Sequence, residues 1–188
     1  METDTQVRIL ESQIRELYGR VVWTHKTQEK CADILLNRHT TLKIIQITLS
    51  ALTTTGILVA VFGEIKAVGI ISAILSALLF GINTYSKDYD LGEISQKHSN
   101  SASELWYIRE SYLSLLTDIK AERLSVEQII EQRDILQEKL NNVYKGAPRT
   151  VNSAYKKATK GLKENEELTF SREEINNLLP EELRNFKN

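Results

Sequence analysis

The chain has 188 residues, the length of about one domain, and it contains a single cysteine, Cys31. One cysteine excludes an internal disulfide framework and is typical of a reducing compartment. The net charge of −1 at pH 7 indicates neither an acidic nor a basic partner, so the distribution of charge along the chain matters more than its total.

Residues 1–43 predict one long amphipathic helix. Apolar residues recur at alternating spacings of three and four, which is the repeat of one helix face. No proline interrupts this repeat, so we expect the helix to continue directly into the apolar segment that begins at Ile44. The repeat consists of Val7, Leu10, Ile14, Leu17, Val21, Cys31, Leu35 and Leu42, with Thr24, Gln28 and Arg38 as its polar members.

Residues 44–86 predict a transmembrane helical hairpin. Twenty uncharged residues run from Ile44 to Gly63, and twenty more run from Ala67 to Ser86. At about 1.5 Å per residue each segment reaches roughly 30 Å, the thickness of the hydrocarbon core of a bilayer. The alternative is a buried hairpin in a soluble bundle. Soluble helices of this length keep a charged face toward water, and the rest of the chain is too small and polar to cover two apolar helices.

Basic residues predict the orientation of the hairpin. Within twenty residues of its two ends lie six lysines and arginines, whereas the turn between the spans contains only Lys66. Cytoplasmic loops carry an excess of such residues. We therefore expect both termini in the cytoplasm and the turn outside. The six are Lys26, Lys30, Arg38, Lys43, Lys87 and Lys97.

Polar and small residues form lines along the two spans. The line in the first span predicts a pore lining that narrows at Ile57, and it consists of Gln46, Ser50, Thr53, Ile57 and Glu64. The second span has a polar line of Ser72, Ser76, Asn83 and Ser86. Beside it, small residues recur every four positions, which lets membrane helices pack closely; they are Gly69, Ala73, Ala77 and Gly81.

Two interpretations of the polar lines stay open. The polar residues either form hydrogen bonds within and between hairpins, or one line faces water in a pore. Two helices cannot enclose a pore, so the second interpretation requires a homo-oligomer, for which we expect four subunits.

Residues 87–145 predict a second helical hairpin, on the cytoplasmic side. The 3-4 repeat continues in Leu91, Ile94, His98, Ser101, Leu105, Ile108, Tyr112, Leu115 and Ile119. A break follows near "KAERLS", and Ser125 is the expected N-cap of a helix that Gly146 and Pro148 terminate. Its apolar stripe is Val126, Ile129, Leu136, Leu140 and Val143. Three such helices must bury their stripes together, so we expect an all-α membrane protein with a coiled-coil-like bundle.

Residues 146–188 predict a basic and then acidic tail of two short helices, the second opened by a capping box of Ser171 and Glu174. The basic stretch contains six cations and no acidic residue: Lys145, Arg149, Lys156, Lys157, Lys160 and Lys163, with Tyr144 and Tyr155 between them. It is either a solvated linker, a contact for anionic lipid, or a site for a nucleotide or oligonucleotide. In the last case the cations neutralise phosphate and the tyrosines stack on bases.

The sequence contains no clear catalytic or metal-binding motif. His25 and Glu29, four residues apart, supply two metal ligands at best. Arg20 and His25 have the Arg-x4-His spacing of helical ribonucleases, but five helical steps place them about 140° apart. We therefore expect no enzyme activity, no metal site and no cofactor.

Three segments together resemble the SLATT domain: "RVVWTHKTQEKCADILLNRHTTLK", the apolar hairpin, and "SQKHSNSASELWYIRESYLSLLTDIK". The resemblance covers roughly residues 10–145 and rests on the residues around His25, Arg38, His98, Leu105, Tyr112 and Leu115. It implies a two-span effector of the bacterial inner membrane, encoded beside a nucleotidyltransferase or a reverse transcriptase. Such effectors disrupt the membrane on phage infection, so that infected cells stop growing or die.

The sequence and the resemblance together predict an oligomeric pore that opens or closes on a nucleotide or oligonucleotide signal from the partner enzyme. The alternative is a non-conducting scaffold that anchors a partner enzyme to the membrane through its cytoplasmic helices.

Overall fold

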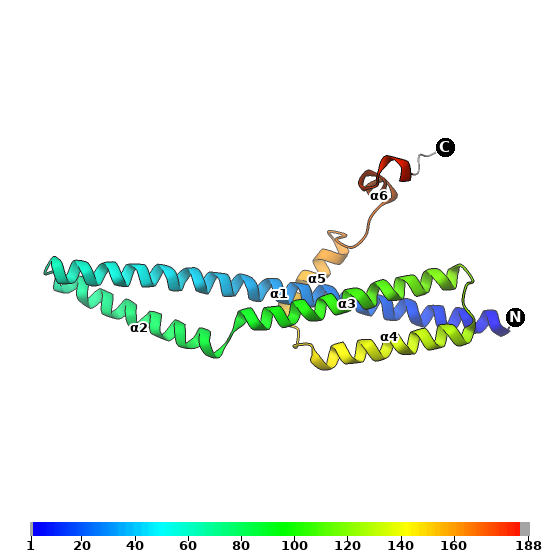
Figure 1. The fold of residues 1–188 in the computed structure, drawn as a ribbon, viewed down its shortest axis with the longest axis horizontal. Helices are drawn as coiled ribbons and strands as arrows, with labels where there is room; N and C mark the ends of the chain where they lie inside the picture. The colour runs from blue at the N-terminus through cyan, green and yellow to red at the C-terminus, as the bar shows by residue number, and fades with distance from the viewer. Residues whose placement is uncertain (1, 185–188) are drawn as a thin grey trace.

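The computed structural model describes residues 2–184 as an elongated rod of helices (Figure 1). Helix α1 (Glu2–Phe62) runs along the whole rod for 61 residues, or about 90 Å. Helix α2 (Lys66–Asp88) returns beside the C-terminal half of α1, and these two segments form the distal hairpin. Helix α3 (Leu91–Lys120) continues back along the N-terminal half of α1. Helix α4 (Val126–Gly146) folds back along this bundle. No strand occurs in residues 2–184. The predicted all-α fold with an apolar helical hairpin is confirmed. The hairpin is continuous with the bundle at α1, whereas Tyr89 and Asp90 separate α2 from α3.

Local side-chain chemistry explains where the helices end. Between α1 and α2, Glu64 adopts a positive φ of 53°, which reverses the chain within three residues. Between α2 and α3, the Asp90 carboxylate accepts a hydrogen bond from the Glu93 backbone N–H and caps α3. Ser125 caps α4 in a reciprocal capping box with Gln128. The predicted N-cap at Ser125 and the predicted end of α4 at Gly146 are confirmed.

The core lies between α1, α3 and α4. Its buried side chains follow the predicted 3-4 repeats, because a helix can bury only one face against two neighbours. Tyr112 is completely buried at the centre of the bundle, and burial raises its pKa to about 12. The other core residues are Leu10, Ile14, Val21, Leu105, Ile108, Leu115, Ile119, Ile129, Leu136, Leu140 and Val143.

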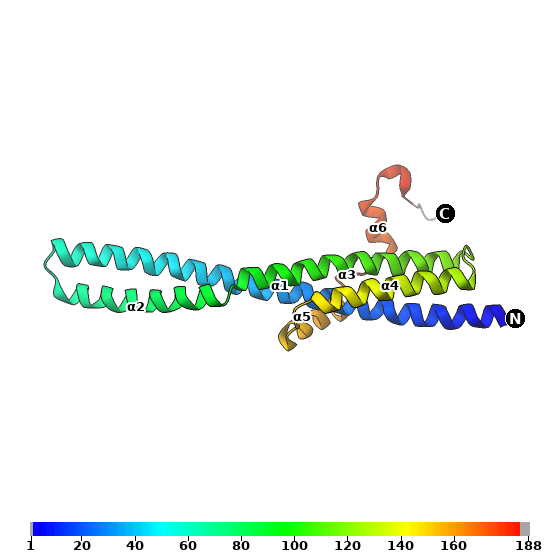
Figure 2. The same cartoon turned by 60° about the horizontal axis from the view of Figure 1, so that its bottom comes forward.

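The end of the described chain forms two short helices on the outside of the bundle. Helix α5 (Asn152–Lys163) crosses α1 near the middle of the rod. Helix α6 (Arg172–Leu178) and a 3-10 turn (Glu181–Leu183) project away from the bundle in both views (Figures 1 and 2). Ser171 and Glu174 form the predicted capping box at the start of α6.

The distal hairpin has little of its surface covered. Helical stretches within Asp4–Phe62 and Lys66–Lys120 are long and apolar enough to cross a membrane, and only 6% of each apolar window is buried. A core helix of a soluble bundle would be largely covered. The hairpin therefore exposes apolar side chains on almost every face, as a lipid-facing element does.

Candidate functional site

The two spans contact each other along a seam of small and polar residues. Gln46 Nε2 donates a hydrogen bond of 3.0 Å to Ser86 Oγ near one end of the hairpin. Toward the turn, a Cβ atom built on Gly69 would lie 3.4 Å from the Ala60 Cβ. Thr53 is also buried in this seam, with 7% of its surface exposed. Small side chains allow the close helix approach on which packing in a membrane depends.

The members of the predicted pore lining differ in exposure. Gln46 and Thr53 point into the seam with α2, whereas Ser50, Ile57 and Glu64 are exposed. The predicted packing line divides as well, because Gly69 contacts α1 and the following three members, Ala73, Ala77 and Gly81, are exposed. No subunit contact is described for either line, so both assignments stay predictions.

A shallow groove of about 630 Å³ runs along one flank of the hairpin, and we call it the polar groove after the hydroxyl and amide side chains that lie in it beside Ile47, Ala51 and Leu79. Ser50 and Thr54 line it from α1, and Asn83 lines it from α2. Gln46 lies at its edge and connects it to the seam. Thr54 was not among the predicted lining residues. Its hydroxyl donates to the Ser50 carbonyl, which satisfies the donor inside its own helix and leaves the oxygen free to accept.

Buried polar side chains link α1 and α3 to the connection between α4 and α5. His98 Nδ1 contacts Gln28 Oε1, and Gln28 Nε2 donates to the Pro148 carbonyl at 3.3 Å. The second contact fixes the Gln28 amide, so His98 Nδ1 is the donor in the first. Burial lowers the pKa of His98. The prediction that His98 packs within the bundle is confirmed.

The basic helix α5 packs against α1 through a face without long side chains. Ala154, Ala158 and Gly161 form this buried face, and they bring the α5 backbone close to α1. On one side Tyr155 stacks on Trp23, with ring centroids 5.6 Å apart. The stretch is therefore docked on the bundle instead of forming a free linker.

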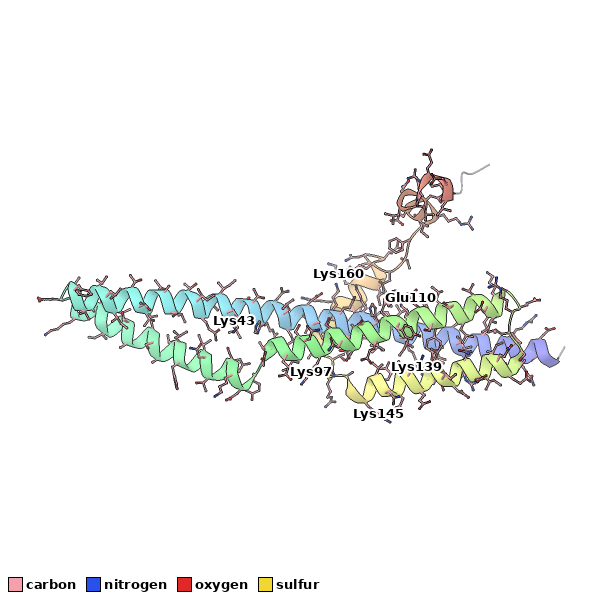
Figure 3. The ribbon with its side chains drawn as sticks, viewed as in Figure 1. Lys43, Lys97, Glu110, Lys139, Lys145 and Lys160 are labelled. Atoms are coloured by element: carbon pink, nitrogen blue, oxygen red, sulfur yellow. The ribbon has the colours of Figure 1, made fainter. Side chains whose placement is uncertain are left out.

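The predicted ligand residues fall into separate groups. Lys145 lies at the end of α4, on the opposite side of the α1–α3 pair from Lys160 (Figure 3). Lys163 Nζ lies 5.7 Å above the Trp23 ring, and Arg149 is exposed in the connection to α5. Lys157 and Lys160 alone of the predicted set line a groove of about 380 Å³ between α5 and α1; Lys156 is exposed outside it.

The groove between α5 and α1 also contains residues that the sequence analysis did not assign to a ligand site. Lys30, Asp33 and Asn37 line it from α1, and Glu167 lines it from the loop after α5. Glu167 forms ion pairs with Lys26 at 2.8 Å and with Lys30 at 3.4 Å. These contacts lower the pKa of Glu167 to about 2, chiefly through the hydrogen bond from Lys26.

The family described as "SMODS and SLOG-associating 2TM effector domain family 4" matches residues 10–174 of this chain. The chain belongs to this family. No curated protein and no solved structure matches the chain. The family match confirms the resemblance to the SLATT domain and extends it beyond residue 145, so that α5 is part of the effector domain.

As a two-transmembrane effector domain, the protein is a membrane protein whose exposed hairpin supplies the two spans. Among residues 2–184, no three histidine, cysteine or acidic side chains lie together in a way that could hold a metal ion. Arg20 is exposed and paired with Glu16, whereas His25 is buried. The SLATT effector therefore does not bring the Arg-x4-His pair together.

Proposed function

We propose that this protein is an oligomeric pore-forming effector of a bacterial antiphage defence system. It resides in the inner membrane with both termini in the cytoplasm. A nucleotide or oligonucleotide from a partner enzyme controls the pore, and its opening depolarises the membrane and stops growth.

The polar groove along the hairpin supports this proposal most directly. Ser50, Thr54 and Asn83 are exposed together on one flank of a hairpin that is otherwise largely apolar. Polar groups facing lipid are unfavourable unless they find hydrogen-bonding partners or water. Several copies of the hairpin with their grooves toward one axis give water a continuous polar path. Four subunits are the expected number.

The continuity of α1 supports coupling between a signal and the pore. Helix α5 and the loop after it contact α1 at Trp23, Lys26 and Lys30, which are roughly 20 to 30 Å along the helix from Ile44. Helix α1 has no break between this region and the first span. A change in how α5 holds α1 therefore tilts or rotates the span that carries Ser50 and Thr54.

The family description supports a partner enzyme. Domains of this family are described as associating with SMODS and SLOG proteins. We propose a nucleotidyltransferase of this kind, or a reverse transcriptase, as the source of the signal, and a non-catalytic role for the effector itself.

Ion flux through liposomes tests the proposal against the scaffold alternative. The purified protein is reconstituted into anionic liposomes, and potassium flux is measured with and without the linear dinucleotide pApA and tripolyphosphate. A pore gives flux that one of these probes changes. A scaffold passes no current in any condition, and flux that is absent throughout would overturn the pore function.

A further inference from the structure

Four lysines from two helices lie around two carboxylates, those of Asp33 and Glu167, on the outside of the bundle. Lys26 and Lys30 come from α1, and Lys157 and Lys160 come from α5 (Lys160 is labelled in Figure 3). The lysine groove is the space lined by Lys30, Lys157 and Lys160 together with the carboxylates of Asp33 and Glu167.

An ion pair with the largely buried Lys26 ammonium holds Glu167 at the lysine groove. Only 10% of the Lys26 side chain is exposed, and burial by itself lowers the pKa of a lysine. Hydrogen bonds to Glu167 and Glu29, at 2.8 and 2.9 Å, outweigh this effect and raise the pKa of Lys26. Removal of Glu167 leaves Glu29 as the one carboxylate within ion-pair distance of Lys26 among the described residues.

The loop after α5 is built to bring Glu167 to this position. Glu166 adopts a positive φ of 51°, an uncommon conformation for a residue with a side chain. The Glu167 N–H donates to the Gly161 carbonyl at 3.0 Å. A Cβ atom at Gly161 would lie 3.0 Å from the Glu167 carboxylate, so glycine provides the space for it.

The four lysines outnumber the three nearby carboxylates, which are those of Glu29, Asp33 and Glu167. Neither Lys157 nor Lys160 has a carboxylate within ion-pair distance in residues 2–184. Glu167 forms ion pairs with the α1 lysines, whereas a ligand with two or more phosphate groups can contact Lys30 and the α5 lysines together. Phosphate also brings more negative charge and more acceptor oxygens than a carboxylate.

We propose that the lysine groove binds a phosphate-bearing ligand and that Glu167 is the internal anion that this ligand displaces. Binding then breaks the ion pairs of Glu167 with Lys26 and Lys30 and loosens the loop that fastens α5 to α1. The inference deepens the proposed function, on which it rests for the phosphate chemistry of the signal, and it names the residues through which that signal acts.

Binding of tripolyphosphate to the full-length protein in detergent, measured by calorimetry, tests the displacement. Glu167→Gln removes the competing charge, so we expect tripolyphosphate to bind roughly five- to tenfold more tightly than to the unchanged protein. Glu164→Gln is the matched control, because Glu164 is exposed on the same loop and forms no ion pair among the described residues. It should change affinity less than about twofold.

Lysine variants test the site itself. Lys157→Glu with Lys160→Glu should abolish tripolyphosphate binding, whereas Lys156→Glu, outside the groove, should retain it within about threefold. In a Trp106→Phe background, Trp23 is the only tryptophan and stacks on Tyr155. Its fluorescence reports whether α5 is still docked in each variant, and its change on adding tripolyphosphate reports release.

The outcomes separate this inference from the pore function. Equal affinities for Glu167→Gln and Glu164→Gln overturn the displacement, and failure of tripolyphosphate to bind either protein overturns the site, while liposome flux can still show a pore. Tighter binding to Glu167→Gln together with fluorescence-detected release supports the inference even if no flux is measured. Equal loss of binding in Lys156→Glu and in the groove variant overturns the assignment to the groove.

Discussion

The Ser72 hydroxyl occupies the space that a side chain at Gly56 would need. A Cβ atom built on Gly56 would lie 2.1 Å from Ser72 Oγ. Ser72 is 2% exposed, and its hydroxyl donates to the Val68 carbonyl at 2.9 Å within its own helix. The two spans therefore come into close contact here through packing, without a hydrogen bond between them.

Gly56→Ala should destabilise the hairpin. The new methyl group overlaps Ser72 Oγ, and overpacking of this kind typically costs about 1–3 kcal/mol. Adding Ser72→Ala should recover most of the loss, because the remaining Cβ of residue 72 lies at an ordinary 3.4 Å. Gly81→Ala is the matched control, since nothing lies within 4 Å of its Cβ position. Thermal unfolding in detergent measures the effect, and equal midpoints for Gly56→Ala and Gly81→Ala would contradict this packing.

Sequence periodicity predicted the bundle because each of its helices has one apolar face. The stripes around Ile14 and Leu105 and the cap at Ser125 follow from spacing and from local hydrogen bonding. The spans are apolar on nearly all faces, so periodicity does not show which face meets the partner. The prediction therefore placed Thr53 with Ser50, although Thr53 faces α2.

The docking of α5 could not be predicted from spacing either. Its buried face consists of Ala154, Ala158 and Gly161, which carry little hydrophobic signal. The α1 residues that hold α5 and its following loop are Trp23, Lys26 and Lys30. Charged and amphipathic side chains have the pattern of a solvated helix face in a sequence. The lysine groove depends on the contact between α1 and α5, which their spacing in the sequence does not predict.

Ala73→Leu with Ala77→Leu should dissociate the oligomer and leave the hairpin folded. Both alanines are exposed in the single chain, on the α2 face where close helix approach needs small residues. Ala67→Leu, also exposed but outside this line, is the control and should keep the oligomer. Native mass spectrometry in detergent gives the subunit number. A monomer or dimer of the unchanged protein at micromolar concentration would exclude the pore.

Stability should fall as the pH drops below about 6.5, the ordinary histidine value. Burial lowers the pKa of both His25 and His98. For His25 the Glu29 carboxylate opposes this effect without reversing it, and Arg109 and Lys26 reinforce it. The unfolded chain then binds more protons than the folded chain between the folded values and about 6.5. The stabilisation is therefore complete above about 6.5 and is lost as the pH falls through this interval.

Thermal midpoints at about pH 7.5 and pH 5.5 measure this loss. His98→Asn should reduce the difference between the two midpoints, because the asparagine amide can still donate to Gln28 but does not take up a proton. Changing His25 to Asn as well should reduce it further. An unchanged difference in the double variant would assign the pH dependence to other groups.

Ser50→Leu with Thr54→Leu should abolish ion flux and leave the oligomer intact. Both residues line the polar groove and are exposed, so leucine fits there but removes the hydrogen-bonding groups that hold water. Thr48→Leu is the matched control, because Thr48 is exposed on α1 but does not line the groove, and it should conduct normally. Thr53→Leu is unsuitable as a test of conduction, since Thr53 is buried in the seam and its replacement disturbs the hairpin.

Ile57 provides the complementary test of the same path. It is 49% exposed one turn beyond the groove, on the side of the hairpin turn, where an apolar ring can close a pore by excluding water. Ile57→Ser should therefore leak potassium without any ligand, whereas the unchanged protein should not. Ser76 is exposed on α2, and Ser76→Leu tests the alternative in which α2 lines the pore. If Ser50→Leu with Thr54→Leu conducts normally and Ser76→Leu does not, then α2 lines the pore and α1 packs outside it.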